Sequence, residues 1–173
     1  MWEIIKDKNF DYRSVVINGY NDCAYEYMAN KNGTERSLEY IFENVPSQAR
    51  ILDFGCGSGI PVSRDLSEEY EVLGVDISEK QIQLAKANVP NAKFMNSDIL
   101  DTQFEAKTFS AIVSFYALFH LPKEKHEEVL AKFYNWLKPK GVLLITVGNT
   151  DEPPYIEHDF FGVTMFWSNF GRT

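Results

Sequence analysis

Short apolar runs alternate along the chain with segments whose apolar residues recur at helical spacing. The apolar runs predict five strands, at residues 50–54, 71–75, 92–95, 110–115 and 142–147. The segments with helical spacing predict four helices, at residues 34–44, 60–69, 78–88 and 123–137. Strands that alternate with helices and read as continuous apolar runs are typical of a parallel sheet covered on both sides. The pattern therefore predicts a doubly wound, mainly parallel α/β fold with helices on both faces.

The ends of the predicted helices carry residues that suit helix starts and stops. Thr34 and Ser78 can cap the first and third helices through their hydroxyl groups. Pro61 falls in the first turn of the second helix, where a missing N–H does no harm. Pro139 and Gly141 are expected to end the last helix before the last strand begins. Ligands of such sheets bind at the carboxyl ends of the strands, so we expect functional residues just after each strand.

An acidic residue and three alternating glycines follow the first predicted strand, at Asp53, Gly55, Gly57 and Gly59. Glycines let the backbone turn sharply and approach a ligand without a Cβ in the way. A plain glycine-rich turn would need only one of them. Ile60 stands where a dinucleotide-binding loop requires glycine, and no lysine follows as in a phosphate loop. The loop therefore favours a ligand other than a pyrophosphate or a triphosphate.

Two further carboxylates follow the next two predicted strands. Asp76, about 20 residues past the glycine loop, can accept both hydroxyls of a ribose, although alone it could equally be a cap or turn residue. Asp98 can accept an exocyclic N–H of adenine, while Ile77 and Ile99 can sandwich the base. Together with Asp53, these carboxylates suit a ligand that carries positive charge.

Five segments resemble, in the right order, the successive motifs of class I S-adenosylmethionine-dependent methyltransferases. These segments are residues 53–59, 74–78, 96–100, 109–114 and 137–143, and the resemblance covers about Ala49 to Val147. It implies a Rossmann-like fold, methyl transfer, S-adenosylmethionine as cofactor and S-adenosylhomocysteine as product. The sequence departs from the family pattern at Ser110, Phe119 and Lys140.

The resemblance also implies roles for individual residues. The glycine loop, with Cys56 at its centre, passes beneath the methionine portion of the cofactor. Asp76 holds the ribose hydroxyls, Asp98 and Ile99 hold the adenine, and the backbone near Ser114 and Phe115 contacts the amino group.

An aromatic segment near the amino end resembles one that folds over the cofactor in family members. Tyr20 and Tyr27 occupy its two tyrosine positions, with Asn21 in the place of the usual aspartate. Both tyrosines are therefore candidate lid residues. The alternative is an aromatic face that packs on the sheet.

Methyl transfer from a sulfonium is an in-line displacement in which alignment of the reacting groups is the main catalytic effect. A general base is needed only when the nucleophile arrives protonated. His120 is the candidate base, because it titrates near neutral pH and lies close to the carboxyl end of a predicted strand. The alternative is a histidine that is packed or hydrogen-bonded in its loop. No metal site is predicted.

Composition narrows the expected partners and compartment. Seventeen Lys and Arg against 25 Asp and Glu give a net charge of −8, which argues against a nucleic-acid partner. The most apolar stretch, residues 109–121, is far shorter than the ~20 residues of a membrane helix, so we expect no membrane association. Two cysteines, Cys23 and Cys56, indicate a reducing, cytoplasmic compartment.

The 173 residues suit a single methyltransferase domain with a helical lid segment at 1–48, a cofactor-binding core at 49–147 and an aromatic tail at 148–173. The resemblance implies two more strands after Val147, so we expect a truncated domain in which they are missing. The alternative is that the tail supplies them as a hairpin. The fifth strand would then be an exposed apolar edge, which predicts a homodimer or an edge covered by the tail. The tail itself could be a substrate lid, a cover for that strand or a partner surface.

Three functions are compatible with these features. The leading hypothesis is a methyltransferase that acts on a small-molecule acceptor. The alternative is a non-catalytic S-adenosylmethionine-binding domain that serves as a partner or regulatory subunit. A nicotinamide-dependent oxidoreductase is the third, and Ile60 argues against it.

Overall fold

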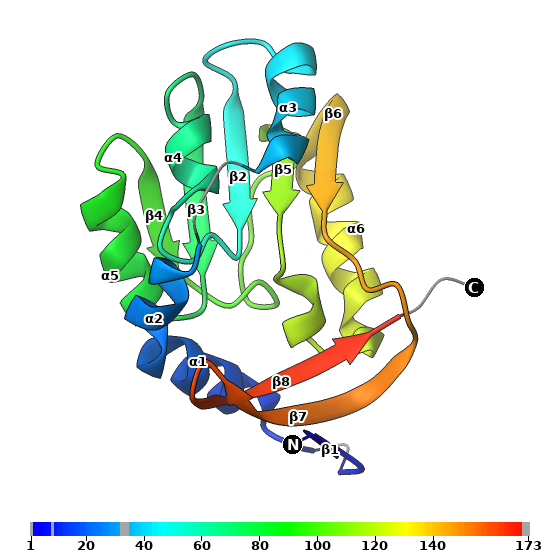
Figure 1. The fold of residues 1–173 in the computed structure, drawn as a ribbon. Coiled ribbons are helices and arrows are strands. Elements are labelled where there is room, and N and C mark those ends of the chain that lie inside the picture. Colours follow the sequence, from blue (N-terminus) through cyan, green and yellow to red (C-terminus); the bar gives the residue numbers. More distant parts are fainter. Residues whose placement is uncertain (1, 8, 32–34, 171–173) are drawn as a thin grey trace.

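The computed structural model describes residues 2–7, 9–31 and 35–170, and its centre is a parallel five-stranded sheet (Figure 1). The strand order is β4-β3-β2-β5-β6. The strands are β2 (Arg50–Phe54), β3 (Glu71–Asp76), β4 (Lys93–Asn96), β5 (Phe109–Ser114) and β6 (Leu137–Ile145). The order changes direction between β2 and β5, which is where ligands bind to open α/β sheets. The predicted doubly wound α/β fold is confirmed.

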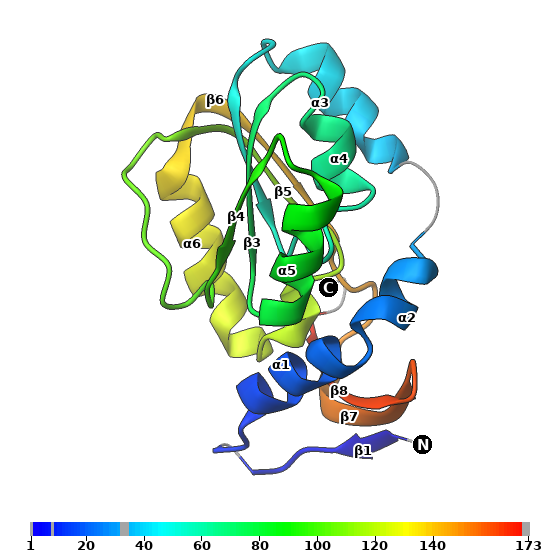
Figure 2. The same ribbon diagram turned by 90° about the vertical axis from the view of Figure 1, so that its left-hand side faces the viewer.

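Helices cover both faces of this sheet, as the side view shows (Figure 2). One face packs against α6 (His126–Trp136), and the other packs against α3 (Glu39–Asn44) and α4 (Val62–Leu66). Alternate residues of β2 point to the two faces, so that Leu52 belongs to the α6 side and Ile51 to the α3 side. A fourth helix, α5 (Glu79–Asn88), lies beside α4 in Figure 2 and contacts β3 and β4.

The helix boundaries agree with the sequence analysis in part. The predicted cap at Ser78 is confirmed, because its hydroxyl accepts a hydrogen bond from the Gln81 N–H at 3.1 Å. The predicted cap at Thr34 lies outside the described residues, and α3 follows a short 3-10 helix, η1 (Arg36–Leu38). Pro61 is the N-cap residue of α4, one position before its predicted place in the first turn, and its carbonyl oxygen accepts a hydrogen bond from the Asp65 N–H at 2.9 Å. Two further 3-10 helices, η2 (Leu118–His120) and η3 (Lys123–Lys125), lie between β5 and α6.

The last strand of the parallel sheet begins earlier than expected. The helix α6 ends at Trp136, before Pro139, as expected, but β6 starts at Leu137, ahead of its predicted start at Val142, and runs through Pro139 and Gly141. A register shift opposite Phe109–Ala111 absorbs this irregular segment, where Lys140 has a φ of 65°. The prediction erred because proline and glycine can sit in an edge strand at a bulge.

The tail forms two strands, which the sequence analysis did not count among the five predicted strands. An antiparallel hairpin consists of β7 (Glu152–Phe160) and β8 (Val163–Asn169). It joins β1 (Trp2–Ile4) in a separate three-stranded sheet of order β1-β7-β8. The hairpin does not extend the parallel sheet, so β6 remains at the edge of that sheet. Within the described residues, the parallel sheet therefore ends at β6, without the two strands that the family resemblance places after it.

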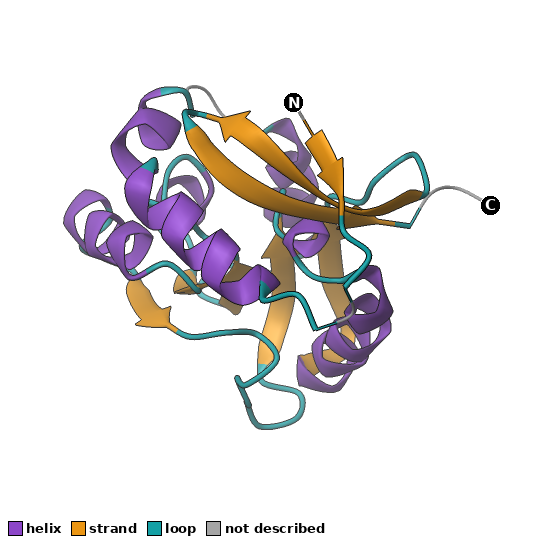
Figure 3. Cartoon of the chain, turned by 90° about the horizontal axis from the view of Figure 1, so that it is seen from below, coloured by secondary structure: helices purple, strands orange, loops and turns teal. Residues whose placement is uncertain are grey.

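The antiparallel sheet lies below the carboxyl ends of the parallel strands, together with α1 (Tyr12–Asp22) and α2 (Ala24–Ala29) (Figures 1 and 3). Val16 of α1 packs against Met165 and Phe166 of β8 in a small core of its own. Gly19 permits this close approach, because a Cβ there would lie 2.8 Å from the Thr164 carbonyl oxygen. We call α1, α2 and the antiparallel sheet the cap.

We expect the α6 face of the core to supply much of the stability of the fold. Phe133 is 0% exposed, and its neighbour Tyr134 is 85% exposed. Phe133→Ala should lower the free energy of unfolding by about 3–5 kcal/mol, because it leaves a cavity in the core. The matched variant Tyr134→Ala should change it by less than about 0.5 kcal/mol. Urea unfolding followed by circular dichroism measures both, and equal effects would contradict this account of the core.

Candidate functional site

A sharp turn of the chain follows β2 and forms the floor of the candidate site. Gly55 and Gly57 have positive φ angles of 72° and 54°, which side-chain-bearing residues rarely adopt. A Cβ at Gly55 would also collide with the side chain of Ala117 in the segment after β5. The two glycines therefore let the loop turn within the space between β2 and the segment after β5.

A cleft at the carboxyl ends of the strands is divided by this loop into two compartments. The β3–β4 compartment is lined by cap residues and by residues at or after the ends of β2, β3, β4 and β5: Tyr12, Arg13, Val16, Tyr20, Tyr27, Phe54, Gly55, Gly57, Asp76, Ile77, Ser97, Asp98, Ile99, Phe115, Tyr116, Ala117, His120 and Leu121. The glycine-loop compartment lies on the other side of the loop and is lined by Tyr27, Asn30, Lys31, Glu35, Asp53, Gly55, Cys56, Gly57, Ser58, Ile60, Pro61, Val62, Phe115 and Tyr116.

The structure brings most of the residues expected from the sequence to this cleft. All of them line one compartment or both, except Gly59 and Ser114. Gly59 faces α5 instead, since a Cβ there would lie 3.1 Å from Val89 and 3.3 Å from Ala85. Ser114 is fully buried, and its carbonyl oxygen accepts a hydrogen bond from the Thr146 N–H at 3.0 Å.

Asp76 links the glycine loop to the end of β3. Its Oδ2 accepts a hydrogen bond from the Gly57 N–H at 2.8 Å, and its Oδ1 accepts one from the Ser78 N–H at 2.9 Å. Burial nevertheless raises the pKa of the Asp76 carboxyl to about 6. Asp76 therefore acts as a turn residue, which was one interpretation of the sequence, and it also lines the cleft, as the other interpretation requires.

Asp53 lines the glycine-loop compartment as a second buried carboxylate. The Ser63 hydroxyl of α4 donates to its Oδ2 at 2.6 Å. Burial raises the pKa of the Asp53 carboxyl to about 7, an effect that this hydrogen bond opposes. Two carboxylates that are costly to ionise in isolation thus face one cleft, and a cationic ligand would favour their charged forms.

Asp98 is held from the cap by an arginine that sequence reasoning missed. The Arg13 Nε of α1 lies 2.9 Å from the Asp98 Oδ2, and a second arginine nitrogen lies 3.4 Å from Asp101. The other Asp98 oxygen accepts a hydrogen bond from the Leu100 N–H at 2.8 Å. No local pattern marks Arg13, because the ion pair joins segments far apart in the sequence.

The candidate base His120 is paired with the candidate lid residue Tyr20. The His120 Nε2 lies 2.7 Å from the Tyr20 hydroxyl, and its Nδ1 lies 2.9 Å from the Phe166 carbonyl of β8. A carbonyl only accepts, so Nδ1 carries the proton and Nε2 accepts from Tyr20. Burial lowers the pKa of the His120 imidazole to about 4, so the ring is neutral at pH 7.

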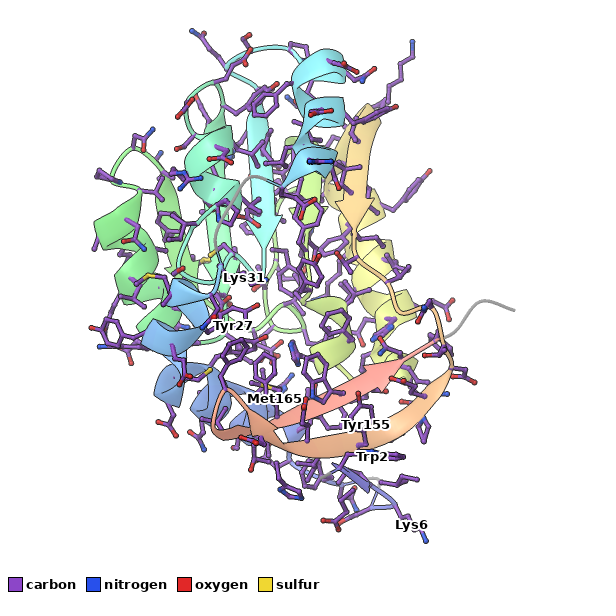
Figure 4. The ribbon with its side chains drawn as sticks, in the orientation of Figure 1. Trp2, Lys6, Tyr27, Lys31, Tyr155 and Met165 are labelled. Carbon is purple, nitrogen blue, oxygen red and sulfur yellow. The ribbon has the colours of Figure 1, made fainter. Side chains whose placement is uncertain are left out.

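Two more residues missed by sequence reasoning lie at the junction of the compartments. Tyr116 lines both compartments, and Lys31 lines the glycine-loop compartment. Figure 4 labels Lys31 and Tyr27, whose side chains lie close together between α2 and the strand ends. Neither Tyr116 nor Lys31 belongs to a motif that can be recognised from spacing.

Buried carboxylates, a glycine turn open to close approach and apolar side chains beside it fit S-adenosylmethionine, which combines a positive sulfur with an adenosine. Residues 51–141 match the family described as a methyltransferase domain. An uncharacterized methyltransferase from Oceanobacillus iheyensis is 26% identical over 137 residues, which cover 74% of this chain and 64% of that protein.

Phosphoethanolamine N-methyltransferase from Plasmodium falciparum is 31% identical over 157 residues, which cover 83% of this chain and 59% of that protein. The structure of the DhpI–SAH complex matches with a TM-score of 0.68 at 18% identity, covering 94% of this chain and 81% of that chain. The chain spans about six-tenths of the length of the two curated relatives. The chain belongs to the class I S-adenosylmethionine-dependent methyltransferases, whose cofactor is S-adenosylmethionine.

We expect binding of this cofactor to tighten as the pH rises from about 5.5 to 7.5. A bound cation favours the charged forms of Asp53 and Asp76, whose pKa values are raised to about 7 and about 6, so binding releases protons below those values. Calorimetry in buffers of different ionisation enthalpy counts the released protons. Asp53→Asn should remove the upper part of the pH dependence. An affinity that stays flat over this range would contradict the assignment.

Proposed function

We propose that this chain binds S-adenosylmethionine in the cleft and transfers its methyl group to a small-molecule acceptor. The observation that carries the proposal is the meeting of three carboxylates, Asp53, Asp76 and Asp98, around the glycine loop at the switch in strand order. These groups come from the ends of three adjacent strands, so they converge only because the sheet is parallel.

Each compartment suits one portion of the cofactor. In the β3–β4 compartment, Asp76 would hold the ribose hydroxyls, and Asp98 would hold the adenine between Ile77 and Ile99. In the glycine-loop compartment, Asp53 and the loop through Cys56 would hold the methionine portion. The amino group of the cofactor would then lie near Phe115 and the backbone of Ser114. Ser114 itself lines neither compartment.

When bound, the cofactor supplies a methyl group activated by a positively charged sulfur. The residues of this chain then have to align an acceptor and exclude water, for which the cap provides a cover. Tyr20 lines the β3–β4 compartment, and its hydroxyl can orient a heteroatom of the acceptor. The neutral His120 holds that hydroxyl in place and can receive its proton when the acceptor arrives protonated.

A small acceptor is supported by the cap and by a relative. Aromatic side chains of α2 and the hairpin, Tyr27 and Phe160, pack against the Tyr20 ring, and such apolar surface suits a small-molecule site. The relative from Plasmodium falciparum is named for a small acceptor, phosphoethanolamine. The net charge of −8 argues against a nucleic-acid substrate.

The cellular location and the oligomeric state of the protein stay predictions from the sequence. Cys23 and Cys56 are free and buried, which supports a cytoplasmic location. Within the described residues, no helix has the length and apolar character needed to cross a membrane. The edge position of β6 supports a homodimer through that strand.

The binding assignment predicts which variants lose the cofactor. Gly57→Val places a side chain in a strained part of the loop, and Asp76→Ala removes the acceptor of two N–H groups, so each should weaken S-adenosylmethionine and S-adenosylhomocysteine by at least about tenfold. Titration calorimetry measures this. Glu127→Ala, which removes an exposed carboxylate on α6, should bind as the wild type does. A wild type without binding heat, or two variants that bind normally, would show the assignment to be wrong.

The transfer assignment is tested separately, by formation of S-adenosylhomocysteine against a panel of small metabolites. Tyr20→Phe removes the hydroxyl held by His120 and should lower kcat by about 10- to 100-fold, while cofactor affinity stays nearly unchanged. Tyr134→Phe, at an exposed position on α6, is the control. Cofactor binding without transfer to any acceptor would favour the non-catalytic alternative instead.

A further inference from the structure

A lysine ammonium lies over the faces of two tyrosine rings at the junction of the two compartments. The Lys31 Nζ lies 4.9 Å from the centroid of the Tyr27 ring and 4.4 Å from that of the Tyr116 ring. Both distances are within the range in which an aromatic face attracts a cation. The two rings therefore already act together as a binding site for positive charge, which a side chain of this chain occupies.

The two rings are held from opposite sides of the cleft. Tyr27 comes from α2 and packs against Phe160 and Phe161 of the hairpin turn, with ring centroids 5.8 and 5.5 Å away. Tyr116 follows β5 and has a φ of 59°, a left-handed conformation that is unusual for a residue with a large side chain. Such backbone strain is concentrated at functional sites, where the surroundings hold it in place.

Among the described residues, the Lys31 ammonium forms no ion pair with a carboxylate. Glu35 lines the same compartment, but its side chain accepts hydrogen bonds from the backbone and hydroxyl of Ser37. Aromatic faces attract a cation without needing its N–H groups. They therefore suit an alkylated ammonium or sulfonium, which has no N–H to donate.

We propose that Tyr27 and Tyr116 form a subsite for an alkylated onium group, and that Lys31 occupies this subsite until such a ligand displaces it. The two tyrosines are shared by both compartments, so the onium group would sit where the two compartments meet. This inference deepens the proposed function, on which it rests. The onium group has two possible sources, an alkylated ammonium group of the methyl acceptor or its product and the sulfonium of the cofactor.

The first arm titrates the whole protein, saturated with S-adenosylhomocysteine, with choline and with its neutral carbon isostere 3,3-dimethylbutan-1-ol, followed by nuclear magnetic resonance. Tyr116→Leu should weaken choline by about 3- to 10-fold and leave the isostere unchanged. Tyr116→Phe keeps the ring and should bind choline as the wild type does. Thermal unfolding of each variant reports whether the fold is intact.

Lys31→Met provides a second variant whose expected effect has the opposite sign. It removes the ammonium that competes for the rings, so choline should bind about 3- to 10-fold more tightly. If Lys31 instead served as a binding group for an anionic ligand, or only as a structural contact, this variant would bind choline no better than the wild type. That result would overturn the role assigned to Lys31.

The second arm compares S-adenosylmethionine, which carries the positive sulfur, with S-adenosylhomocysteine, which does not. If the sulfonium occupies the subsite, Tyr116→Leu should reduce the affinity ratio of the two by about 3- to 10-fold. A change in the choline arm alone assigns the subsite to the acceptor or product. If neither arm shows a change, the proposal is wrong. The proposed function still stands in that case, provided that the wild type binds both cofactor forms.

Discussion

The hydrogen bonds of one buried carboxylate hold the candidate site together. Asp76 is 9% exposed, and it accepts from the backbone of the glycine loop and from the backbone at the start of α5. Removing a carboxylate from water is costly, and these two N–H groups offset that cost only in part, as the raised pKa of the Asp76 carboxyl shows. The position of the loop, and with it the division of the cleft, depends on this interaction.

The cap acts as part of the site and not only as its cover. Its α1 helix supplies Tyr20 and Arg13, which contact His120 and Asp98 from across the cleft. Its hairpin supplies the Phe166 carbonyl, which determines which nitrogen of His120 carries the proton. The tautomer of the candidate base is therefore set by a residue in the antiparallel sheet, more than 40 positions along the chain.

Much of the fold could be predicted because its signals are local. The apolar runs of β2, β3 and β5 are buried strands, and the carboxylates and glycines that follow them are adjacent in sequence to the strands that place them. A hairpin in the tail was only an alternative, because Pro153 and Pro154 interrupt the strand pattern, and the register shifts there between Glu152 and Tyr155. The contacts of Arg13 and Lys31 could not be predicted, since each depends on how α1 and α2 fold back over the sheet.

The antiparallel sheet joins the two ends of the described chain, because β1 near the amino end pairs with β7 near the carboxyl end. Closing so long a loop costs entropy before its contacts are gained, whereas the parallel core is built from segments that follow one another closely. From this cost we expect the core to form before the antiparallel sheet, so that the wall carrying Tyr20, Tyr27 and Phe166 becomes ordered last. The cleft of this protein is completed only when both ends of the chain have come together.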